Sequence, residues 1–118
     1  MVNRLNPGPP PLAERRPKSR KRVLLAGIVT YAKGAHTLDC SIRSLSETGA
    51  RLVVGLSIQC PKSFYLINVR EGVVYDATWV WTKGAEIGAK LENSRHVNAI
   101  TDPSLKFLKR LWLAKAAS

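Results

Sequence analysis

The sequence predicts a mainly β protein, a six-stranded antiparallel β-barrel followed by one C-terminal α-helix. Six short segments rich in β-branched and aromatic residues follow one another at regular spacing, and glycine-bearing turns separate several of them. Near the C-terminus the apolar period changes from two residues to about 3.6, which is typical of an amphipathic helix. Of the two architectures that such strands favour, a sandwich and a barrel, the barrel leaves no sheet edge exposed.

The strands can be placed in order along the chain. The first is the aliphatic run at 23–31, and the others are expected at 37–43, 49–54, 62–69, 73–82 and 85–91. Within 73–82 the two-residue period puts Tyr75, Ala77, Trp79 and Trp81 on one face. We therefore expect Trp79 and Trp81 to fill the core; the alternative is that one of them lines a ligand surface.

The two ends of the chain differ from this strand-rich middle. Residues 1–13 hold four prolines, which lack a backbone donor, so we expect a disordered tail ahead of a domain that spans 14–118. Asp102 and Pro103 predict the start of a helix over about 102–116. Its apolar face is expected to dock on the barrel, with a membrane surface or a partner helix as alternatives; this face consists of Leu105, Leu108, Leu111 and Trp112.

Charge is the most informative bulk property. The formal net charge is +11, and six of the eight residues in 15–22 are basic, so the partner is expected to be anionic. Nucleic acid, an acidic protein, anionic lipid and a phosphorylated small molecule all satisfy this condition. Nucleic acid is disfavoured because the aromatic residues are few and are expected in the core, which leaves no stacking platform.

Nothing in the sequence indicates an enzyme, a metal site or a cofactor. Cys40 and Cys60 lack ligand spacing and lie in strand-like text, so buried structural thiols are expected. His36 and His96 have no neighbouring nucleophile or carboxylate pattern and are interpreted as solvated residues at strand ends or in loops. With no apolar run of about 18 residues and no signal peptide, we expect no transmembrane segment and a cytoplasmic location.

Two short motifs carry the functional information. Arg16 and Arg20 are separated by three residues directly before the first strand, and the sequence Ser44-x-Ser46-x-x-Gly49 lies between the second and third strands. In this order and in this β context they resemble the signature of the PilZ domain, RxxxR followed by [D/N]xSxxG. The resemblance covers residues 14–115 and includes the Gly49-Ala50-Arg51-Leu52 continuation and the hairpin at 80–91.

The resemblance implies a bacterial receptor for the second messenger cyclic-di-GMP, a nucleotide-binding signalling protein with no catalytic residues. An arginine fork matches a phosphate or a guanine edge bidentately, which lysine cannot do. The arginine segment would clasp the nucleotide against the barrel, where Ser46 would donate to a phosphate or guanine acceptor and Gly49 would allow a positive φ or close approach of the ligand. The implied site residues are Arg15, Arg16, Arg20, Ser44, Ser46 and Gly49.

Ser44 departs from the family pattern. The family has Asp or Asn there, whose side chain accepts from the N1–H and N2–H₂ donors of guanine, whereas serine offers a single short hydroxyl. The alternative function is therefore a degenerate PilZ adaptor that binds a downstream protein partner without nucleotide. The resemblance suggests control of motility, exopolysaccharide or biofilm, and a small barrel of this kind is expected to be a monomer or weak dimer.

Overall fold

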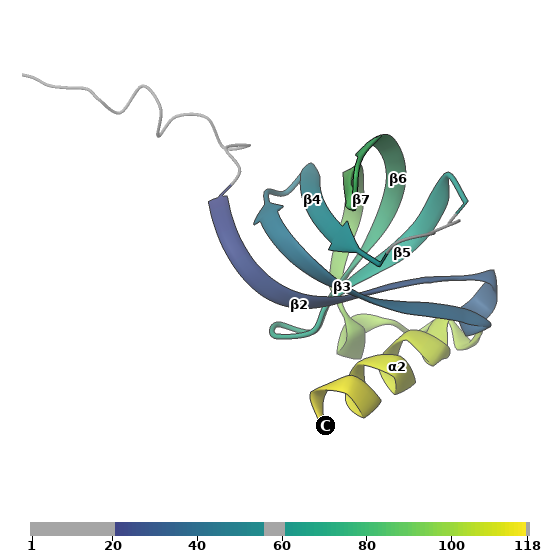
Figure 1. Ribbon diagram of the computed structural model, residues 1–118. Helices are drawn as coiled ribbons and strands as arrows, with labels where there is room; N and C mark the ends of the chain where they lie inside the picture. The colour runs from purple at the N-terminus through teal and green to yellow at the C-terminus, as the bar shows by residue number, and fades with distance from the viewer. Residues whose placement is uncertain (1–20, 56–60, 118) are drawn as a thin grey trace, which may run out of the picture.

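The computed structural model describes residues 21–55 and 61–117, which form a closed antiparallel β-barrel with a helix beneath it (Figure 1). The strands are β2 (Lys21–Tyr31), β3 (His36–Leu45), β4 (Gly49–Val54), β5 (Ser63–Asn68), β6 (Val73–Lys83) and β7 (Glu86–His96). Around the barrel they are ordered β2-β3-β4-β7-β6-β5, and all neighbouring pairs are antiparallel. The fold class predicted from the sequence is confirmed.

All six predicted strands occur, and β7 differs most from its expected bounds. The sequence predicted an end at residue 91, but β7 continues to His96 in partnership with β6. A register shift opposite Tyr75, with Asn93 at a positive φ of 54°, breaks the two-residue period there. Asp76 holds this segment, since its carboxylate accepts hydrogen bonds from Asn93 at 2.7 Å and from Arg95 at 2.9 Å.

The inward-facing residues of all six strands fill the barrel interior. Cys40, Ile42, Leu52, Leu66 and Ile87 belong to one buried cluster, which draws side chains from all six strands. Alternation along β4 is strict, with Ala50, Leu52 and Val54 buried and the intervening residues half-exposed. Because every second residue is buried, the residues between them face the outer surface of the barrel, where a ligand can bind.

The expectation for the tryptophans is half right. Trp79 packs against the interior cluster as predicted, but Trp81 is 38% exposed and lies on the outer surface. The pairing of β6 with β7 shifts register between Trp79 and Trp81, so that Trp79 is opposite Ala89 and Trp81 is opposite Gly88. The extra residue, Val80, breaks the two-residue period and turns Trp81 to the other face.

The C-terminal helix α2 (Lys106–Ala116) docks on the barrel as predicted, but it starts later. Asp102 caps a single 3₁₀ turn (Pro103–Leu105) by accepting from the backbone N–H of Ser104 at 2.9 Å, and the α-helix begins only after that turn. A second buried cluster joins helix and barrel, with Trp112 donating from Nε1 to the Val69 carbonyl at 2.8 Å. The buried members of this second cluster are Ile28, Ile67, Val74, Val97, Phe107 and Leu108.

The cysteine and histidine expectations agree with the structure where it describes them. Cys40 is buried in the barrel, and desolvation raises the pKa of its thiol to about 12, as expected for a structural thiol. His36 and His96 are exposed at strand ends, stacked on Tyr31 and edge-on to Trp112 respectively. Cys60 and the proline-rich tail predicted for 1–13 lie outside the described residues. Among the helices in 21–55 and 61–117, none has the length and apolarity to cross a membrane.

Candidate functional site

A row of five directly paired residues runs across the outer face of the barrel. Arg22 of β2 is opposite Ser44 of β3, Ser44 is opposite Arg51 of β4, Arg51 is opposite Gly88 of β7, and Gly88 is opposite Trp81 of β6. Because directly paired residues share a face, these side chains form one continuous strip. The strip places two guanidinium groups, a hydroxyl, a glycine without a side chain and an indole on neighbouring strands.

Three of the register shifts between strands lie directly next to residues of this row. They lie between Arg22 and Leu25 in β2, between Ile42 and Ser44 in β3, and between Trp79 and Trp81 in β6. Bulges re-aim side chains and are over-represented beside functional sites. Here they turn Ser44 and Trp81 out of the alternation that packs Ile42 and Trp79 against the core. The irregularities therefore build the strip.

The strip borders a hollow of about 490 Å³ that carries mostly positive charge. That volume is within the range of roughly 300–1,000 Å³ typical of ligand sites. Three cations and one carboxylate contribute to its wall, together with Ser44 and Trp81; the charged residues are Arg22, Arg51, Lys83 and Glu86. An anion is the ligand that this charge distribution favours.

Arg51 forms an ion pair across the hollow. Its Nε lies 3.7 Å from the Glu86 carboxylate, which is an ion-pair distance but too long for a good hydrogen bond. The same Nε is buried and has no hydrogen-bond partner among the residues that the structure describes. The ion pair therefore orients the Arg51 guanidinium without satisfying all of its donors.

Gly88 makes room for the Trp81 indole. A Cβ on Gly88 would overlap Nε1 and Cε2 of Trp81, so the ring lies directly over the glycine backbone. Trp79 steadies the bulge from beneath, because its Nε1 donates to the Trp81 carbonyl at 3.0 Å. Together these contacts hold an exposed aromatic ring in a defined place beside two arginines.

Trp81 also forms part of a second hollow, of about 290 Å³, on the side of the SxSxxG turn. The Ser46 hydroxyl serves that turn: Oγ accepts from the N–H of Thr48 at 3.2 Å and of Gly49 at 3.1 Å, and donates to the Gly49 carbonyl at 3.3 Å. The backbone N–H of Ser46 donates to the same carbonyl at 2.9 Å. Ser46 thus shapes the turn that closes this hollow.

One sequence-based expectation for Gly49 is wrong. Gly49 does not have a positive φ; the described glycines that do are Gly34, Gly72 and Gly84. The β4 strand begins at Gly49 in extended conformation, and a Cβ there would make only an ordinary contact, 3.5 Å from the Ala89 carbonyl oxygen. Neither the backbone nor the neighbours require glycine, so close approach of a ligand stays as the functional prediction for this position.

The structure brings together part of the predicted site. Ser44, Ser46 and Gly49 lie around the two hollows that share Trp81, with Ser44 only 8% exposed between its arginine neighbours. Arg15, Arg16 and Arg20 lie outside the described residues. Arg22, the second residue of β2, is two residues after Arg20 in the chain, so the RxxxR segment is covalently joined to the end of β2 that carries the row.

As members of the site, sequence reasoning missed Arg51, Lys83, Glu86 and Gly88. It offered Trp81 only through the alternative that one of two tryptophans lines a ligand surface. The alternation of β4 could have identified Arg51, because it faces opposite to the buried Ala50 and Leu52. No local pattern could have identified Trp81, whose orientation depends on a bulge. Glu86 reaches the hollow from β7, diagonally across from Arg51, and this proximity exists only in the folded barrel.

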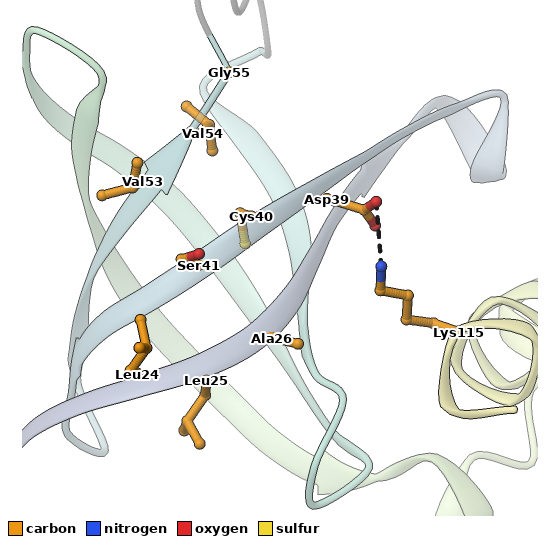
Figure 2. A pocket seen from close by; sticks show the side chains of 10 residues that line it. All are labelled: Leu24, Leu25, Ala26, Asp39, Cys40, Ser41, Val53, Val54, Gly55 and Lys115. Carbon is orange, nitrogen blue, oxygen red and sulfur yellow. Dashed lines mark ion pairs between the residues drawn. The ribbon is translucent and has the colours of Figure 1, made fainter. Parts of the chain in front are cut away.

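A larger hollow, of about 630 Å³, lies over β2, β3 and the end of β4 (Figure 2). Its wall is mainly apolar, from Leu24, Leu25, Val53 and Val54, and Lys115 of α2 enters from the side. Lys115 pairs with Asp39 at 3.2 Å, so the cation and the carboxylate there offset one another. This hollow therefore lacks the arginines and the exposed aromatic ring of the Arg22–Trp81 strip.

Comparison of the sequence with known protein families and with curated proteins gives no match. Over residues 21–55 and 61–117, no three His, Cys, Asp or Glu side chains gather as metal ligands.

Proposed function

We propose that this chain is a PilZ-like receptor that binds cyclic-di-GMP between the RxxxR segment and the outer face of the barrel. The observation that carries the proposal is the row of Arg22, Ser44, Arg51, Gly88 and Trp81, which sets two guanidinium groups beside an exposed indole. Cyclic-di-GMP combines two phosphates with two guanines. The ligand needs bidentate cations and a stacking surface, and the row offers both.

The position of the motifs supports the same function. The RxxxR segment leads directly into the strand that carries Arg22, and the SxSxxG turn closes the hollow on the other side of Trp81. A nucleotide on the strip would therefore contact both motifs at once. A net charge of +11 would also speed its encounter with an anionic ligand. We propose a cytoplasmic signalling role in which ligand binding changes the surface offered to a downstream protein.

Isothermal titration with cyclic-di-GMP, with GTP as the control, tests this function. We expect binding in the micromolar range or tighter for cyclic-di-GMP and none for GTP, which lacks the paired guanines. No heat and no thermal stabilisation at high concentrations of cyclic-di-GMP would reject the receptor. That result would favour the adaptor function, to be pursued by a search for a protein partner.

Trp81→Ala is expected to weaken cyclic-di-GMP binding by about 5- to 150-fold, because base stacking on an aromatic ring contributes about 1–3 kcal/mol. Trp81→Phe should retain part of the affinity, since it keeps a ring over Gly88. The affinities can be measured by titration of each variant, with the neighbouring exposed Thr82→Ala as the matched control. Equal affinities of Trp81→Ala and the unaltered protein would remove stacking from the proposed site.

A further inference from the structure

A guanine base held on the Arg22–Trp81 strip would present two donors, N1–H and N2–H₂, that need an acceptor. The side chains around the hollow beside the strip include three cations, an indole N–H donor and one serine hydroxyl. None of these offers two acceptor oxygens side by side. Ser44 is short and 8% exposed, and it lies between Arg22 and Arg51. The pairing requirement of guanine must then be met from elsewhere in the hollow.

Glu86 is the carboxylate that lines this hollow. It belongs to β7 at the position directly opposite Val53, diagonal to Arg51 and two residues before Gly88. Residues two apart on a strand face the same side, so Glu86 lies on the outer face with Gly88 and its partner Trp81. Its side chain is about one-third exposed, which leaves it accessible from the hollow.

The neighbours of Glu86 orient its carboxylate. Arg51 Nε lies 3.7 Å from Glu86 Oε2, and Lys83 is the residue directly opposite Glu86 on β6. The guanidinium of Arg51 and the ammonium group of Lys83 therefore flank this carboxylate. An ionised carboxylate accepts two parallel N–H···O bonds, and charge-assisted bonds of this kind are about twice as strong as neutral ones.

We propose that Glu86 supplies the acceptor for the guanine N1–H and N2–H₂ donors and so makes the site selective for guanine. The assignment rests on the proposed function, because it concerns a cyclic dinucleotide bound at the same strip. It accounts for the serine at position 44: the acceptor that the PilZ pattern places on the second strand is provided here from β7, across Arg51. Adenine lacks both of these donors, so cyclic-di-AMP carries the same phosphates but cannot make the two parallel hydrogen bonds to Glu86.

The test is titration of Glu86→Gln with cyclic-di-GMP and with cyclic-di-AMP. The amide leaves one acceptor and directs an NH₂ group at the guanine donors, so we expect cyclic-di-GMP binding to weaken by about 10- to 100-fold. Binding of cyclic-di-AMP should change less than about threefold, since only phosphate and stacking contacts are involved. Glu71→Gln, exposed in the turn between β5 and β6, is the matched control. Adding Ser44→Asp to Glu86→Gln should restore the preference for guanine by returning a carboxylate to the strip.

The outcomes separate the assignment from the proposed function. Binding of cyclic-di-GMP by the unaltered protein, with affinity and guanine preference retained in Glu86→Gln, would overturn the role of Glu86 alone. Tighter binding of both nucleotides by Glu86→Gln would also overturn it, since the carboxylate would then repel phosphate without contacting the base. If the unaltered protein bound neither nucleotide, the receptor function itself would fail, and the assignment with it. Circular dichroism and thermal melting of each variant check that the fold is retained.

Discussion

Arg16→Ala and Arg20→Ala are each expected to weaken cyclic-di-GMP binding at least about a hundredfold. Each substitution removes a guanidinium fork, and hydrogen bonds to charged groups contribute about 1.5–3 kcal/mol apiece, so losing two gives a loss of this size or larger. The melting temperature should not change, because both arginines precede β2 in the sequence, whereas the buried clusters are built from β2 onward. Titration and thermal melting of the same preparations measure the two effects.

The matched control for these arginines is Lys106→Ala, at the exposed start of α2. It lowers the net charge by the same amount, so any loss of affinity that it shares with the arginine variants reflects overall electrostatic attraction. Undiminished affinity in both Arg16→Ala and Arg20→Ala would contradict the clasp. Arg16→Lys and Arg20→Lys distinguish fork geometry from charge, because lysine keeps the charge but cannot pair bidentately.

Leu108→Ala is expected to lower the free energy of unfolding by about 2–5 kcal/mol, the range for leucine-to-alanine changes in well-packed cores. Leu108 is 0% exposed where α2 meets the barrel, and removing its side chain leaves a cavity beside Ile67 and Val74. Denaturation with urea, monitored by circular dichroism, gives the change. Nucleotide affinity of the folded fraction should be retained, because Leu108 is not among the residues that line the hollows around the strip.

Leu113→Ala provides the comparison for Leu108→Ala within the same helix. Leu113 is 49% exposed, so the same chemical change should cost less than about 1 kcal/mol. If Leu108→Ala lowers the free energy of unfolding no more than Leu113→Ala does, the docking of α2 through its buried face is contradicted. The pair therefore tests the amphipathic assignment independently of any ligand.

Local sequence determines most of the elements. The aliphatic segment Gly49–Val54 was predicted as a strand, and in a strand Ala50, Leu52 and Val54 face the same side of the sheet, where they are buried. Leucines at helical spacing likewise predicted the docked face of α2, and Asp102 predicted a cap, which forms on the 3₁₀ turn directly before α2. These features depend on residues close together in the chain, where propensity and periodicity act directly.

The residues of the candidate site also fall into those that the local sequence predicts and those that only the folded barrel brings together. The sequence by itself determined the barrel, the docked helix, and the positions of Ser44, Ser46 and Gly49 around one turn. Only the tertiary structure decided that Trp81 faces outward, because a bulge at Val80 reverses the period of β6. It also decided that Glu86 of β7 lies beside Arg51 of β4, because these two strands pair in the barrel although they are far apart in the sequence. Side-chain periodicity is local, whereas register and strand order are set when the whole barrel closes.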